Sequence, residues 1–210
     1  VGCALSWLRI WELTGQQRFY DLALQSYEGM HSRLSRDDGL YYCEASIYWP
    51  LGEKNAIFEG GSSSFLTGNM GMAALSAKFY KITGKEEYLA RVYATNEGLL
   101  KFYDDDGVLV NDRDAWTNGA FAAYYAAEVL SLPDTERMQE LVKSTAVSIM
   151  KNARTTNGYY GGSWSGPAEG GASGWYAKGS IPQQSMTTGT SVLMVVSAAV
   201  MEAQLDDYAR

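Results

Sequence analysis

Residues 68–80 read GNMGMAALSAKFY, and small and apolar side chains recur in them at three and four positions. This spacing predicts a helix that packs closely on another helix. The pair Thr83-Gly84 ends the pattern, and apolar residues over 88–100 again follow a helical spacing. The sequence therefore predicts a helix, a glycine turn and an antiparallel helix, closed by a second turn at Asp105-Asp106-Gly107.

The same order of elements occurs earlier in the chain. Two helical patterns there end at Thr14-Gly15 and at Asp37-Asp38-Gly39. Gly15 and Gly84 are 69 positions apart, and Gly39 and Gly107 are 68 positions apart. A third, degenerate copy ends near Asn157-Gly158. Helical hairpins that recur at a fixed period predict an array in which each hairpin buries its apolar face on its neighbours.

The array predicts a single all-α domain over residues 1–210. Its hairpins are expected over about 2–34, 65–103 and 115–154, with a closing helix over about 190–205 that is apolar enough to be a buried inner helix. A ring of six hairpins needs about twelve helices, and about seven are predicted. We therefore expect an (α/α)6 toroid that is incomplete in this chain, with about 100 further residues upstream completing it. If the chain is whole, an open array should bury the stripe of its first helix on another molecule.

Composition excludes several classes of protein. No stretch of 18 apolar residues suggests a membrane span, although 46% of the residues are hydrophobic. A net charge of −7 with no concentrated basic face argues against a nucleic-acid partner. The chain has 15 Tyr and 6 Trp against 6 Phe, so most of its aromatic rings carry a polar edge. Such rings suit a wet groove as well as a core.

Cysteine and histidine are too few for a metal site. The chain contains only Cys3, Cys43 and His31 of these types, so we expect neither a metal nor another cofactor. The cysteines are predicted to be buried small hydrophobes or to form one disulfide bridge.

Candidate site residues lie in three segments that follow the hairpin turns. Loops that follow equivalent helices of a hairpin array gather at one end, so their side chains converge on one groove. Aromatic rings beside Asp and Asn suit a sugar, because a pyranose has an apolar face and a polar rim. Each Trp taken alone is more often a packing residue. The candidates are Tyr48, Asn55, Asp112, Trp116, Asn118, Trp164 and Trp175.

Carboxylates provide a second criterion, because glycoside hydrolysis needs two of them. Adjacent acidic residues occur at 37–38, 104–106 and 206–207. The first two sets fall in the repeated turn before a glycine, where Asp is favoured for turn geometry. Asp112 lies outside that turn and is a better candidate for the groove.

Several of these segments together resemble glycoside hydrolase family 76, the endo-α-1,6-mannanases. The resemblance covers most of residues 1–130 and rests on the helix ending in Thr14-Gly15, on Lys54-Asn55-Ala56-Ile57, on Asn69, and on Val110-Asn111-Asp112 followed by Trp116-Thr117-Asn118-Gly119. It implies a retaining glycosidase of α-mannan, a polysaccharide or oligosaccharide partner, and a secreted or cell-surface location. Asp112 matches a family aspartate that lines the sugar site, whereas Asn118-Gly119 matches only part of a Tyr-Asn-Gln-Gly motif.

The family's paired catalytic aspartates stand directly before the helix that corresponds to 5–13. They are therefore expected upstream of Val1, and this chain is expected to supply walls of the cleft. Two alternatives remain open. One is a catalytically inactive toroid that only binds carbohydrate, and the other is a different (α/α)6 sugar enzyme. An epimerase would need histidine acid–base groups, so the single His31 argues against that version.

Overall fold

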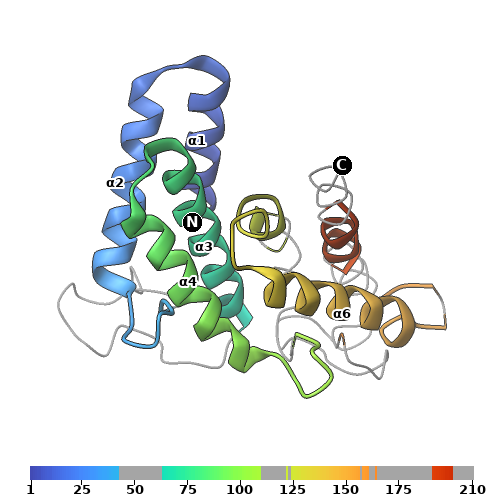
Figure 1. Ribbon diagram of the computed structural model, residues 1–210. Helices are drawn as coiled ribbons and strands as arrows, with labels where there is room; N and C mark the ends of the chain where they lie inside the picture. The colour runs from blue at the N-terminus through green and yellow to red at the C-terminus, as the bar shows by residue number, and fades with distance from the viewer. Residues whose placement is uncertain are drawn as a thin grey trace, which may run out of the picture.

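The chain folds into consecutive helical hairpins (Figure 1). This computed structural model describes residues 1–42, 63–109, 122, 124–156, 158–160, 164 and 191–200. Within these ranges no extended strand forms, and β structure is limited to isolated bridges. The predicted all-α class is confirmed.

Helices α1 (Gly2–Thr14) and α2 (Gln17–Leu34) form the first hairpin. Gly15 adopts a left-handed conformation with φ of 66°, and its N–H donates to the Trp11 carbonyl at 2.7 Å. A residue without a Cβ adopts this conformation at little cost, so the helix ends where the glycine stands. The predicted turn at this point is confirmed.

The helical spacing of apolar residues in this hairpin predicts inward faces that include Leu5, Leu8, Leu22, Ala23 and Tyr27, and this prediction is confirmed in part. Ala4, Leu5 and Leu8 of α1 are buried, as are Ala23 and Tyr27 of α2. Two expectations are wrong. Leu22 was expected to point inward but is 40% exposed, because it lies about 100° around the helix from Ala23. Cys3, expected to be buried or bridged, is an exposed free cysteine.

Helices α3 (Ser63–Thr83) and α4 (Glu86–Leu99) form the second hairpin, which continues into the short 3-10 helix η2 (Leu100–Phe102). Gly84 repeats the conformation of Gly15, with φ of 67° and an N–H that donates to the Tyr80 carbonyl at 2.7 Å. Residues 69–77 of α3 are all buried. Small side chains explain this burial, because they let neighbouring helices approach α3 closely.

The third part of the array contains a helical stretch at 124–128 and α6 (Glu136–Asn152). A further helical stretch covers 191–200. It was expected to be a buried inner helix, and this is only partly correct. Ser191, Met194, Ser197 and Ala198 are buried, but between 42% and 51% of the surface of each residue is exposed at Val192, Leu193, Val196 and Val200. The apolar composition of this stretch is compatible with a helix buried on one face and with a helix buried on all sides. Composition alone therefore could not predict which of the two forms.

The repeated turn is present three times. Antiparallel bridges join Ser35 to Tyr41, Tyr103 to Leu109 and Arg154 to Tyr160. Each bridge encloses a glycine in a left-handed conformation, with φ of 79° at Gly39, 72° at Gly107 and 86° at Gly158. The third turn follows α6 as the first two follow α2 and the α4–η2 segment. The predicted repeat and its degenerate third copy are therefore confirmed.

Two groups of buried side chains make up the core of the described part of the chain, and α3 contributes to both. The N-terminal cluster joins α1 and α2 to Met72, Leu75 and Phe79 of α3. The central cluster joins Met70, Ala73 and Ala77 of α3 to α4, α6 and the helical stretches at 124–128 and 191–200. The side chain of Tyr80 packs against both clusters. Among the described residues no helix is both long and apolar enough to cross a membrane.

Candidate functional site

Six of the seven predicted site residues lie outside the described residues. They are Tyr48, Asn55, Asp112, Trp116, Asn118 and Trp175. Their proposed place in a groove stays a prediction. The structure does describe how the chain enters the segments 43–62 and 110–121 that carry five of them. The polar contacts at these two entries are described next.

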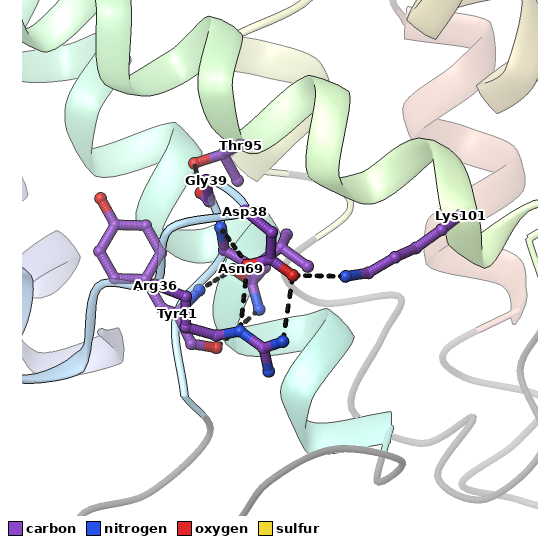
Figure 2. Close-up of polar contacts among 8 residues, drawn as sticks. Arg36, Asp38, Gly39, Tyr41, Asn69, Thr95 and Lys101 are labelled. Atoms are coloured by element: carbon purple, nitrogen blue, oxygen red, sulfur yellow. Dashed lines mark hydrogen bonds and ion pairs between the residues drawn. The ribbon is translucent and has the colours of Figure 1, made fainter.

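The turn before the segment 43–62 is held by one carboxylate (Figure 2). Asp38 accepts two hydrogen bonds of 3.0 Å from the Arg36 guanidinium and one of 2.6 Å from Lys101 Nζ. Burial alone would raise the pKa of Asp38, but hydrogen bonds from Lys101, the Leu40 N–H and Arg36 outweigh it and lower the pKa. Thr95 on α4 donates to the Gly39 carbonyl at 3.0 Å. Asp38 therefore closes the turn, as its position before a glycine predicted, and ties it to η2, while Thr95 ties it to α4.

Asn69 anchors the next residues of the same turn. Its Oδ1 accepts from the Tyr41 N–H at 2.7 Å, and its Nδ2 donates to the Tyr41 carbonyl at 3.1 Å (Figure 2). The side chain is fully buried on α3, so these two bonds satisfy polar groups that water cannot reach. The sequence indicated Asn69 only through the family resemblance and did not predict that it anchors this turn. A single amide within a run of small apolar residues was the available signal for this role.

The Tyr41 side chain is held as firmly as its backbone. Its hydroxyl lies 3.0 Å from His31 Nδ1 on α2. Burial and the nearby positive charge of Arg91 lower the pKa of His31, which favours the neutral imidazole at pH 7. His31 is therefore part of the support of the turn.

The second turn, before the segment 110–121, uses a different carboxylate. Asp104 Oδ1 accepts from the N–H of Asp106 at 3.1 Å and from the N–H of Val108 at 2.8 Å. The Leu109 N–H donates to Thr145 Oγ1 on α6 at 3.0 Å. Each turn is thus fastened to the helix of the following hairpin. The prediction that Asp104 serves turn geometry is confirmed.

Three polar groups are buried beside the second turn: the hydroxyls of Tyr103 and Tyr125 and the amide of Asn96. The Tyr125 hydroxyl donates to Asn96 Oδ1. The Tyr103 hydroxyl is buried and has no hydrogen-bond partner among the described residues. Burial raises the pKa of both phenols, so both hydroxyls stay protonated at neutral pH. The Tyr125 proton is already donated to Asn96, so the Tyr103 hydroxyl is the one of the two that can donate a hydrogen bond close to the entry of the segment 110–121.

Trp164, the seventh predicted site residue, lies in the central cluster and is fully buried. Its Nε1–H donates to Ser191 Oγ at 2.9 Å, and its carbonyl accepts from Ser148 Oγ at 2.8 Å. A ring with no exposed face cannot stack on a sugar. This position argues against the predicted platform and gives Trp164 a packing role between α6 and the helical stretch 191–200. In the described part of the chain, no cluster of three or more metal-ligating side chains occurs.

We compared the chain with protein families, curated proteins and solved structures. No protein family and no curated protein matches the sequence. Solved structures do match. A family 76 α-1,6-mannanase from Salegentibacter sp. HEL1_6 aligns over 94% of this chain and 57% of its own, with 19% identity and a TM-score of 0.69. The chain shares the fold of this mannanase.

Two further solved structures share the fold of this chain. A family 76 glycoside hydrolase from a bovine Bacteroides thetaiotaomicron strain aligns over 96% of this chain and 42% of its own, with 16% identity and a TM-score of 0.69. A Listeria innocua protein aligns over 96% of this chain and 54% of its own, with 20% identity and a TM-score of 0.64. This chain spans about half the length of these structures. It therefore represents part of an α/α toroid, as the hairpin repeat predicted.

Sugar complexes exist for the Salegentibacter enzyme. Variants made inactive by replacing two adjacent aspartates were solved with α-1,6-mannotriose and with α-1,6-mannotetrose. In the present chain, two sets of adjacent aspartates fall in described residues, and Asp38 and Asp104 of these sets are bonded within their turns. These two carboxylates are structural.

Proposed function

We propose that this chain forms part of the cleft of a glycoside hydrolase that acts on α-mannan through α-1,6 linkages. The observation that carries the proposal is the fold shared with α-1,6-mannanases over 94% of the chain. The two fastened turns add support. They hold the entries of segments that are rich in residues able to bind a sugar.

Within this proposal the six residues outside the described ranges have distinct roles. Asp112, Asn118 and Asn55 would form hydrogen bonds with sugar hydroxyls, because carboxylates and amides can pair with neighbouring hydroxyl groups. Tyr48, Trp116 and Trp175 would present rings to the apolar face of a pyranose. The fastened turns would limit the conformational entropy lost when the segments bind.

The proposed reaction is hydrolysis with retention at the anomeric carbon. One carboxylate attacks this carbon while a second protonates the departing oxygen, and the second then activates the water that releases the sugar. We assign neither role to a described residue. Asp38 and Asp104 are excluded because their oxygens serve the turns.

The proposal is tested with the full-length product of the gene that encodes this chain. Incubation with α-1,6-mannan should release oligosaccharides with new reducing ends, and NMR of the first product should show the α-anomer. Retention of the protein on immobilised mannan without new reducing ends would instead support a toroid that only binds. If the protein neither releases oligosaccharides nor stays bound to the immobilised mannan, the proposal is refuted.

Asp112 offers a residue-level test of the same site. Asp112→Ala should weaken binding of α-1,6-mannotriose by about tenfold or more, because a hydrogen bond to a charged group contributes about 1.5–3 kcal/mol. Asp105→Ala is the matched control, since Asp105 is exposed in the second turn. Unchanged affinity in Asp112→Ala would remove this residue from the site.

A further inference from the structure

A small groove lies between α4 and the start of α6. Its volume is about 230 Å³, and none of the residues predicted for the sugar site lines it. Seven side chains line it: three from α4, one from η2, one from the turn before α6 and two from the first turn of α6. They are Tyr93, Asn96, Glu97, Leu100, Asp134, Arg137 and Met138. We refer to this feature as the α4–α6 groove.

The α4 side of the groove is a regular helical stripe. Tyr93, Asn96, Glu97 and Leu100 follow one another at three, four and seven positions from the first, so they share one face of the helix. The Tyr93 hydroxyl donates to the Pro133 carbonyl at 3.2 Å. This bond ties the chain just before α6 to α4. The two walls of the groove are therefore held together by a direct contact.

The floor of the groove carries an amide with unused donors. Asn96 is only 6% exposed, and its Oδ1 is taken by the Tyr125 hydroxyl. Its Nδ2 makes no hydrogen bond within the described part of the chain. A buried amide normally satisfies both of its groups, so Nδ2 is suited to donate to an atom in the groove.

Charged groups of both signs stand around the rim. Glu97 and Asp134 supply acceptors, and the Arg137 guanidinium supplies donors. None of the three takes part in an ion pair among the described residues. Burial and the nearby charge of Asp134 raise the pKa of Tyr93, so its hydroxyl stays protonated and keeps its bond to Pro133.

These properties restrict the ligand. An anion would meet two carboxylates, and a cation would meet the guanidinium. A neutral ligand with many hydroxyls can use donors and acceptors at once, and Tyr93, Leu100 and Met138 can contact an apolar face of it. The volume lies below the ~300–1,000 Å³ of pockets that hold drug-sized ligands, which limits the ligand to about one ring.

We propose that the α4–α6 groove binds one pyranose unit of a neutral saccharide. The site uses the amide of Asn96 at its floor, the ring of Tyr93 at its wall and the side chains of Glu97 and Arg137 at its rim. It goes beyond the proposed hydrolase activity, because it requires no reaction. Such a site would hold a polysaccharide on the surface formed by α4 and the start of α6.

The test is an NMR titration of the full-length gene product with methyl α-D-mannopyranoside. Amide signals of 93–100 and 134–138 should shift in a saturable way. Arg137→Ala and Glu97→Gln should each weaken this binding about tenfold, because each removes a charge-assisted hydrogen bond. Arg33→Ala, which removes an exposed arginine of α2, is the matched control and should bind as the original protein does.

The outcomes are separable from those of the hydrolase assay. Saturable shifts in the groove that Arg137→Ala weakens about tenfold support the site even if no mannan is cleaved. Groove signals that do not move up to the solubility limit of the sugar would overturn it. Equal affinity in Arg137→Ala, Glu97→Gln and the unsubstituted protein would overturn it as well. So would groove shifts produced by inorganic phosphate and not by the sugar.

Discussion

At the scale of single residues, Gly39 shows why the repeated turn needs glycine. Its φ of 79° disfavours any residue with a Cβ. A Cβ built at this position would also lie 2.2 Å from the Ala94 carbonyl oxygen of α4. Conformation and space therefore both exclude a side chain, and the turn can approach α4 closely enough for Thr95 to donate to the Gly39 carbonyl.

Alanine substitutions separate these two effects. Gly158→Ala should lower the free energy of unfolding by about 1–2 kcal/mol, because only the left-handed conformation opposes it at a position with open space around it. Gly39→Ala should lower it by more than about 3 kcal/mol, because the clash with α4 is added. Gly29→Ala, in mid-helix with open space, should stabilise by about 0.5–1 kcal/mol. Urea denaturation measures all three. Equal losses for Gly39→Ala and Gly158→Ala would contradict the proposed contact with α4.

Asn69 gives a second prediction at this scale. Asn69→Ala leaves the Tyr41 N–H and carbonyl without partners and should lower the free energy of unfolding by about 2–5 kcal/mol. Asn69→Asp places a carboxyl in the same buried space, where desolvation raises its pKa above the unfolded value of about 3.9. Its stability should therefore be highest below pH 4 relative to the original protein and fall as the pH rises through the folded pKa. Denaturation between pH 3 and 7 tests this, and a pH-independent difference would contradict it.

At the scale of elements, one lysine joins three helices. Lys78 of α3 lies 2.5 Å from Glu12 of α1 and 3.2 Å from Glu128 in the helical stretch 124–128. Burial alone would lower the pKa of Lys78, but its bonds to Glu12 and Glu128 outweigh it and raise the pKa. For Glu12, burial opposes ionisation, yet hydrogen bonds from Lys78 and Arg9 lower the pKa below its usual 4.5. These partly buried charges link the helices more effectively than an exposed pair would.

The sign of the Glu12 shift makes this link pH-dependent. A lowered folded pKa gives stability that is present above about pH 4.5 and is lost as the pH falls through the folded pKa. Lys78→Met should therefore destabilise the protein at pH 7 by about 1–3 kcal/mol. The difference from the original protein should shrink below pH 4. Lys85→Met is the control, because Lys85 is 62% exposed and should change stability little. Unfolding curves across this pH range check both variants, and a Lys78→Met loss that persists at pH 3 would contradict the link.

The sequence predicts helices and turns better than it predicts burial. Thr14-Gly15 and Thr83-Gly84 end their helices through local backbone geometry, which a short stretch of residues determines. Whether Leu22 or Val196 is buried depends on which elements pack beside it, and nearby residues contain little of that information. Trp164 shows the same limit for the candidate site. A tryptophan in a glycine-rich segment can stack on a sugar or fill a core, and only its contacts with Ser148 and Ser191 distinguish the two.

At the scale of the whole molecule, α3 and α4 both contribute to the two core clusters, and α3 is the more deeply buried of the two helices. Its residues 69–77 are all buried, with Leu75 in the N-terminal cluster and Met70 in the central cluster. The hairpin of α1 and α2 contacts the rest of the core mainly through the N-terminal cluster. Stability should therefore differ along the chain, with α3 the last element to open.

Hydrogen exchange followed by mass spectrometry tests this order. Amides of α3 should exchange only through global unfolding, whereas those of α1 and α2 should exchange at a lower free energy, because this hairpin can leave α3 while the central cluster stays intact. Leu8→Ala removes a fully buried side chain of the N-terminal cluster and should cost about 2–5 kcal/mol, with faster exchange in α1 and α2 but not in α6. Met138→Ala in the central cluster is the matched variant and should accelerate α6 first. If Leu8→Ala accelerates α6 as much as α1, the clusters unfold as one unit and α3 does not separate them.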